Sequence, residues 1–238
     1  CFFLNGISFF LVIVALMFIK VEPPTPHAGA RPHIFTDLKQ GLSYVRHHRL
    51  MVTLMALVLV STFLAMPIQT FLPTFARTVL ADAGGTPETR LSILMACQGL
   101  GAVTGALLIG ALSGRFQHMG RMLLAVQFLM GIVIAAFGWS TTPLVSYVLI
   151  FLGGISFMAL FSMSFSIVQL AVPEALRGRV VAIYMVALRG GGPIGALVSG
   201  HFADIYSAPT VMIFNGLLLS LLTAAFVASG KGSSLKTM

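Results

Sequence analysis

The stretch PEALRGRVVAIYMVALRGGGPIGALVSGHFAD, residues 173–204, places a charge inside a long apolar segment. Arg177 and Arg179 stand near its start, and Arg189 follows ten residues after Arg179. Because a helix rises about 1.5 Å per residue, Arg189 would lie roughly 15 Å inside, near the middle of a bilayer core about 30 Å thick. A charge at that depth costs at least about 2.5 kcal/mol and normally faces a polar cavity or a partner. We therefore predict a functional role for Arg189, either in binding an anionic group of a substrate or in pairing with an acid of another half. The alternative is a structural role, in which its long side chain satisfies carbonyls freed around Gly190 to Pro193.

Glycine and proline follow this arginine and weaken the helix at a point where a substrate path needs backbone freedom. Small residues four positions apart also let helix backbones approach closely, either as static packing or as a sliding seam against another half. We expect hinge or packing roles at two groups of residues: Gly190, Gly191, Gly192, Pro193 and Gly195 here, and Pro67, Pro73, Gly101 and Gly105 in earlier segments.

The composition identifies an integral membrane protein. Hydrophobic residues make up 58% of the 238 residues and charged residues 8%, with a mean hydropathy of +0.99, which leaves too few polar side chains to cover a water-facing surface. The formal net charge of +8 does not indicate nucleic acid binding, because the basic residues lie between apolar runs. Cys1 and Cys97 form no CxxC pair, so neither a disulfide framework nor a metal site is predicted.

Seven apolar runs are long enough to span a bilayer as helices: 2–19, then about 51–76, 90–113, 122–139, 144–170, 179–203 and 210–228. If they alternate in direction, most basic residues fall on one side of the membrane: Lys20, Arg31, Lys39, Arg46, Arg49, Arg115, Arg121, Arg177, Arg179, Lys231 and Lys236. The positive-inside rule therefore predicts that this side, which includes the C-terminus, is cytoplasmic.

The polar sequence between the first two spans predicts a cytoplasmic linker. Within it Ile34, Leu38, Leu42 and Val45 recur at helical spacing, so an amphipathic helix is expected over 34–48, lying on the membrane surface and either contacting lipid or bracing the domain.

Three parts are expected along the chain. Residues 1–19 form a last transmembrane helix of a preceding half, 20–50 form the linker, and 51–238 form a six-helix domain with a short cytoplasmic tail. Because the sequence begins inside an apolar run without an initiator Met, we expect the C-terminal part of a longer protein. The ends of two predicted helices, GALSGRF at 110–116 and GALVSGHF at 195–202, are similar and hint at an internal three-helix repeat.

This order of one helix, a basic linker, a surface helix and six helices resembles the major facilitator superfamily from its sixth helix onward. GALSGRFQHMGR, residues 110–121, resembles the superfamily's basic loop motif, although Gly114 stands where the motif usually has Asp. PEALRGR, residues 173–179, with LRGGGPIG, residues 188–195, is similar to the enterobactin-exporter-like branch of bacterial efflux carriers. The resemblance implies an all-α fold with inverted three-helix repeats in a bacterial inner membrane. It also implies a gating role for the loop residues Gly110, Arg115, Gly120, Arg121, Glu174, Arg177, Gly178 and Arg179.

In this superfamily the first and fourth helices of each half line the central cavity. The resemblance therefore implies that Gln69, Ser162, Ser166 and Gln169 face substrate together with Arg189. The alternative for the serines is a hydrogen bond back to their own helix. Gln98, Gln127 and Asn215 fit hydrogen bonds between helices.

The leading hypothesis is a secondary active exporter of a small drug-like or siderophore-like solute, which works by alternating access against an N-terminal six-helix half. Two alternatives are a lipid-modifying membrane enzyme and a non-transporting membrane scaffold. The enzyme would need a nucleophile, a metal cluster or paired acids, whereas Asp82, Glu88 and Asp204 are scattered singly.

No cofactor is predicted. Gly190, Gly192 and Gly195 fit the spacing GxGxxG, but they lie within a spanning segment that includes Pro193, and not at the strand-to-helix turn that binds a dinucleotide. None of the six acidic residues lies deep inside a predicted span. If protons are the coupling ion, the titrating carboxylate is therefore expected in the other half.

Overall fold

A computed structural model describes residues 2–18, 34–81, 84–112 and 119–229 of the chain, and the elements formed by these residues are helices. The chain divides into two compact units, residues 1–33 and 34–238. In the first, α1 (Phe2–Met17) is an apolar helix of 16 residues. It rises about 24 Å, somewhat less than a bilayer core, so the predicted crossing over 2–19 stays a prediction.

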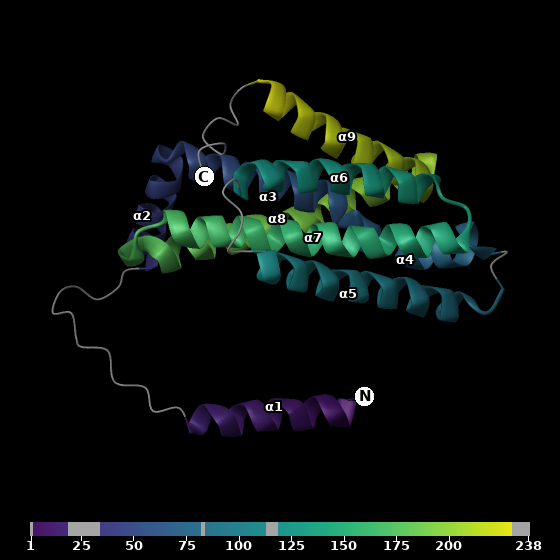
Figure 1. Ribbon diagram of the computed structural model, residues 1–238, viewed down its shortest axis with the longest axis horizontal. Helices are drawn as coiled ribbons and strands as arrows, with labels where there is room; N and C mark the ends of the chain where they lie inside the picture. The colour runs from purple at the N-terminus through teal and green to yellow at the C-terminus, as the bar shows by residue number, and fades with distance from the viewer. Residues whose placement is uncertain (1, 19–33, 82–83, 113–118, 230–238) are drawn as a thin grey trace. The chain divides into compact units, whose positions relative to one another are not determined.

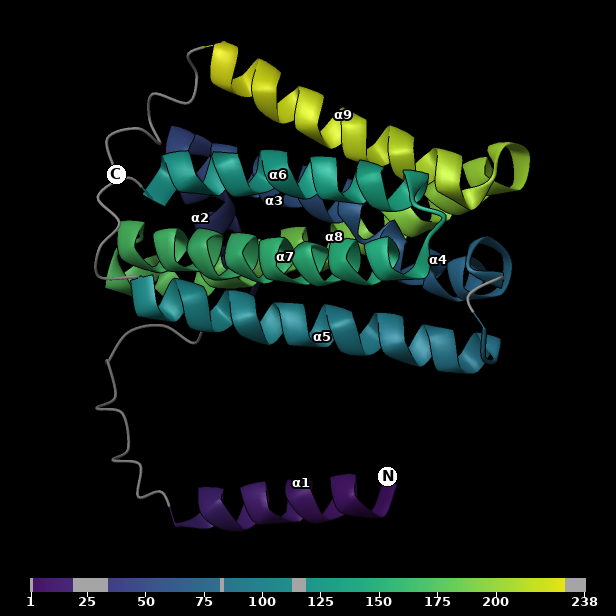
Figure 2. The ribbon, with the colours of Figure 1, turned by 45° about the vertical axis from the view of Figure 1, so that its right-hand side comes forward.

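The second unit contains the six predicted spans, which lie side by side as a bundle (Figures 1 and 2). The first span is built of three consecutive segments, α3 (Arg49–Ala65), α4 (Pro67–Thr74) and the π-helical turn η1 (Phe75–Val79). The others are α5 (Pro87–Leu112), α6 (Met119–Trp139), α7 (Pro143–Ala171), α8 (Glu174–Tyr206) and α9 (Ala208–Ala228). All six are long and apolar enough to cross a membrane, which confirms the prediction of six spans in this part of the chain.

A helix is also present where the surface helix is predicted, as α2 (Ile34–His47), while its place on the membrane surface stays a prediction. It lies at the end of the bundle where α7 ends and α8 begins, and it contacts α8 and α3 (Figure 1). The starts of α3, α6 and α8 lie at this same end (Figure 1). The described part of the predicted linker therefore lies beside the helix starts that were assigned to one side of the membrane.

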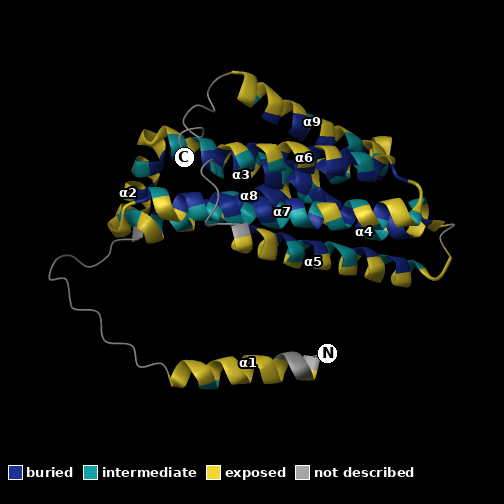
Figure 3. Ribbon diagram, in the orientation of Figure 1, coloured by how far each residue is buried: buried dark blue, intermediate teal, exposed yellow. Residues whose placement is uncertain are grey.

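The core runs along the middle of the six spans, while the outer faces of α5 and α9 are exposed (Figure 3). Large, fully buried apolar side chains form it, among them Leu54, Leu72, Phe75, Phe137 and Met163. Because lipid tails are as apolar as these side chains, close packing rather than the hydrophobic effect must hold the spans together. The glycines provide that packing.

Two helix pairs are packed in the same way through glycines four residues apart. A Cβ atom at Gly101 or Gly105 of α5 would collide with the backbone of α7, and one at Gly191 or Gly195 of α8 would collide with α3. The second glycine pair stands 90 positions after the first in the sequence. The first three spans begin with α3, α5 and α6, and the last three are α7, α8 and α9. The second helix of each set of three therefore packs against the first helix of the other set, as an internal repeat requires.

The third helices complete this arrangement. Gly131 of α6 and Gly216 of α9 face each other, and a Cβ at either would meet the other's backbone carbonyl, at 2.6 Å for Gly131 and 2.5 Å for Gly216. By contact, Gly105 and Gly195 occupy corresponding places at the two crossings. The repeat suggested by the similar helix ends stays a prediction.

Helix interruptions were predicted near Pro67 and Pro73 and again at 190–193, and the structure shows them only at the first of these places. The first span is interrupted at Pro67, which begins α4, and it becomes π-helical after Pro73. In contrast, α8 is continuous from Glu174 to Tyr206 and includes Pro193. A hinge at 190–193 therefore remains a prediction.

One contact links the kinked span to the continuous one. Pro67 has no N–H to donate to Phe63 O four residues earlier, and Gly195 of α8 lies directly against that carbonyl. A Cα–H group of glycine can approach a carbonyl closely and interacts with it favourably. The kink in the first span and the small residue in α8 are therefore complementary parts of one contact.

Candidate functional site

Arg189 lies at the centre of α8, with 15 residues before it in the helix and 17 after it. Its side chain is exposed, and within the described part of the chain it makes no hydrogen bond or ion pair. A guanidinium group has five N–H donors and keeps its charge, so it needs acceptors when it leaves water. Arg189 is therefore a mid-span charge without a hydrogen-bond or ion-pair partner among the described residues.

The polar residues predicted on α7 share one face of that helix. Ser162, Ser166 and Gln169 follow one another at intervals of four and three residues; the serines are half-buried and Gln169 is exposed. The two serines do not hydrogen-bond back to their own helix, unlike the buried Ser156 and Ser164, which donate to Leu152 O (2.9 Å) and Leu160 O (2.7 Å). The alternative explanation for Ser162 and Ser166 is thus wrong in this structure, and their hydroxyls remain available.

Gln69 lies just after the kink that Pro67 produces. Its side chain is exposed, and its backbone N–H donates to Met66 O at 3.1 Å, three residues back. Gln69 and Gln98 together line a small cavity of about 20 Å³ between α4, α5, α6 and α7, with mainly apolar side chains around them. That volume is about one water molecule, so the cavity is too small for an organic solute.

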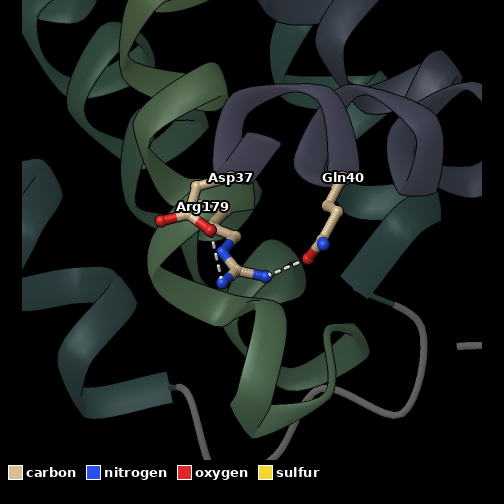
Figure 4. A network of polar contacts seen from close by, with 3 residues as sticks. All are labelled: Asp37, Gln40 and Arg179. Carbon is tan, nitrogen blue, oxygen red and sulfur yellow. Dashed lines mark hydrogen bonds and ion pairs between the residues drawn. The ribbon is translucent and has the colours of Figure 1, made fainter. Parts of the chain in front are cut away.

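At the end of the bundle, Arg179 connects α8 to α2 (Figure 4). Its guanidinium forms an ion pair with Asp37 at 2.7 Å and donates a hydrogen bond to Gln40 Oε1 at 2.5 Å. The pair is half-buried, and Gly41 lies against the Arg179 stem, where an added Cβ would come within 3.1 Å. One of the predicted gating arginines is therefore engaged by the linker helix.

Most of the other described loop-motif residues are exposed. Glu174 begins α8, and it is exposed together with Arg177 and Gly178. In the first motif Gly110 is exposed near the end of α5, Gly120 is buried and Arg121 is exposed at the start of α6, while Arg115 lies outside the described residues. The structure thus brings Arg179 to a partner and leaves Arg121 and Arg177 at the surface.

Two polar contacts between distant segments were missed by the sequence reasoning. Tyr184 of α8 is fully buried, and its hydroxyl lies 2.7 Å from Ser164 Oγ of α7. Asp37 pairs with Arg179 across 142 positions of sequence. The two residues of each pair are far apart in the sequence, so neither pair forms a local motif. For Asp37 and Arg179, the opposite charges of the two side chains were the one signal in the sequence that could have suggested the contact.

Two larger cavities lie elsewhere, between α3, α8 and α9. One has a volume of about 420 Å³ and the next about 300 Å³, and they share the lining residues Phe63, Leu64 and Leu218. They are almost wholly apolar, apart from Tyr206, Thr210 and the pair in which Asn215 Nδ2 donates to Ser199 Oγ at 2.9 Å. This bond confirms the predicted helix-to-helix role of Asn215. None of the predicted cavity residues lines either space.

Six long apolar helices, a helix across one end and a charge at mid-span define the class: a multi-pass membrane protein of the major facilitator type. A family model for transmembrane secretion effectors matches residues 1–232, and the chain belongs to this family of membrane transporters. Among curated proteins none matches the chain. Within the described residues, no three His, Cys, Asp or Glu side chains gather into a group that could hold a metal ion.

Proposed function

We propose that the chain exports a small organic solute of drug-like or siderophore-like character by alternating access. The six-helix unit moves against a second six-helix half, and Arg189 is the pivot of the substrate path. The observation that supports this most directly is the exposed, unpaired Arg189 at the middle of α8. A charge there is stable only if it faces a hydrated cavity, an anionic solute or an acid of the opposing half.

The polar face of α7 supports the same proposal. Ser162, Ser166 and Gln169 present hydroxyl and amide groups that no neighbour within the described residues uses. Such groups provide adaptable hydrogen bonds for a solute that passes through, while Arg189 provides a fixed charge. Protons are the proposed coupling ion, with their carboxylate in the opposing half.

The proposed orientation follows from the charges. The end that includes α2 faces the cytoplasm of a bacterial cell, and the C-terminus lies on that side. The described basic residues near that end include Lys39, Arg46, Arg121, Arg177 and Arg179.

A vesicle assay tests the transport proposal. The full-length protein is reconstituted into vesicles, a proton gradient is imposed, and the movement of fluorescent drugs and catechol-type iron chelators is followed. Protein-dependent movement of at least one solute without chemical change supports a carrier. Absence of movement across the panel, or recovery of a chemically altered lipid, would instead favour the scaffold or the enzyme.

A further inference from the structure

The surface helix α2 has one face that is already occupied by the six-helix unit. Asp37 pairs with Arg179, Gly41 lies against Arg179 and Ile183, and Val45 is buried. These contacts involve positions 37, 41 and 45, which recur every four residues along one side of the helix. They fix both the position of α2 and its rotation about its own axis.

The free side of α2 begins beside this contact face with Leu38 and Leu42 and continues to Lys39 and Arg46 on the far side. Leu38 is 54% exposed and Leu42 is 55% exposed, and Lys39 and Arg46 are also exposed. Asp37, the acidic residue of α2, is engaged by Arg179. The charge that remains on the free side is therefore entirely positive.

The location of α2 at the end of the bundle determines which environment its free side contacts. Because α2 lies at the ends of spans long enough to cross the bilayer core, its expected depth is the boundary between that core and the headgroups (Figure 1). In water the two leucines would expose apolar surface at a cost of about 25 cal/mol per Å². At a membrane interface the leucines enter the upper acyl region, while Lys39 and Arg46 extend to the headgroups.

We propose that the free side of α2 binds anionic phospholipid headgroups through Lys39 and Arg46, with Leu38 and Leu42 inserted among the acyl chains below them. The partner is identified by charge complementarity, since a basic side chain near an anionic leaflet contributes about 1 kcal/mol. Zwitterionic lipid offers the same acyl chains without the net charge. This lipid site does not depend on the transport proposal.

Tryptophan fluorescence provides the test, because the sequence contains a single Trp, Trp139. The variant Trp139→Phe with Leu42→Trp places the only indole on α2, and Leu38→Trp is a second reporter if the first disturbs the fold. The protein is reconstituted into vesicles that contain brominated phosphatidylglycerol or, separately, brominated phosphatidylcholine at equal mole fraction. We expect an apparent enrichment of the anionic quencher between about fivefold, if one of the two basic residues contacts a headgroup, and about thirtyfold, if both do.

Two controls accompany this measurement. Replacing Lys39→Gln and Arg46→Gln together should abolish the preference, whereas Arg77→Gln, an exposed arginine near the other end of the first span, should not change it. Native Trp139, at the far end of α6, should be quenched equally by both lipids. Equal quenching of the α2 reporter by the two lipids would overturn the proposal, and so would absence of quenching by either, which would mean that this side is covered or faces water.

Discussion

Arg90 and Arg189 both depart from the charge pattern that orients the chain, yet their surroundings differ completely. Arg90 is 7% exposed, and its guanidinium donates hydrogen bonds to Gly84 O (3.0 Å), Ala76 O (2.9 Å) and Gly85 O (2.9 Å). It therefore fastens the loop after η1 to the start of α5. Arg189 has no comparable acceptors within the described residues. The sequence could predict the depth of Arg189, but not the role of Arg90, because backbone carbonyls have no signature in sequence.

Removing the Arg90 side chain should destabilise the protein without altering its substrate path. Arg90→Ala leaves three carbonyls without their donor, and we expect a loss of about 3 kcal/mol from the free energy of unfolding. Arg90→Lys should lose less, since an ammonium can still reach one or two of the carbonyls. Unfolding in mixed detergent micelles, followed by circular dichroism, measures both. Wild-type stability of Arg90→Ala would show that these hydrogen bonds are not important.

At the scale of elements, the sequence predicted most helices and missed how they pair. Periodicity and apolar length identify the six spans and α2, because both depend on local composition. The crossings of α5 with α7 and of α3 with α8 depend on glycines that meet a particular backbone, such as Gly195 against Phe63 O. Small residues are frequent in membrane helices, so the sequence could not separate the glycines at crossings from Gly190, where an added Cβ meets no atom within 4 Å.

This difference provides a matched pair of substitutions on α8. Gly195→Ala would force a Cβ into the carbonyl of Phe63 and should cost about 2 kcal/mol, as overpacking does. Gly190→Ala enters open space and should be neutral, or stabilising by up to about 1 kcal/mol through helix propensity. Both are measured as free energies of unfolding in micelles. Equal effects of the two substitutions would contradict the packing described for α3 and α8.

At the scale of the whole molecule, the charge pattern and the alternating spans together predict orientation. The structure places α2 and the starts of α3, α6 and α8 at one end, in agreement with alternating directions (Figure 1). Which end faces the cytoplasm depends on the positive-inside rule alone. Likewise, the described residues include no partner for Arg189, so neither the sequence nor the fold could identify one.

Reporter fusions test the orientation. A reporter joined after Lys39 or Lys236 should show cytoplasmic activity, because basic residues concentrate on that side, and one inserted near Gly84 should show external activity. Alkaline phosphatase and a fluorescent protein, which are active on opposite sides of the membrane, provide independent readings. A reversed pattern would overturn the assignment of the two ends.

The proposal that Arg189 is the pivot is tested most directly by substrate binding. For a solute found to move in the vesicle assay, its affinity is measured for wild-type protein and for folded Arg189→Lys and Arg189→Ala, with Arg177→Lys as a control near the start of the same helix. Lys keeps the charge but loses the planar fork, so we expect Arg189→Lys to lose most transport, and Arg189→Ala to lose nearly all transport and at least tenfold in affinity. Arg177→Lys should spare affinity. Unchanged affinity and transport in Arg189→Ala would contradict the account.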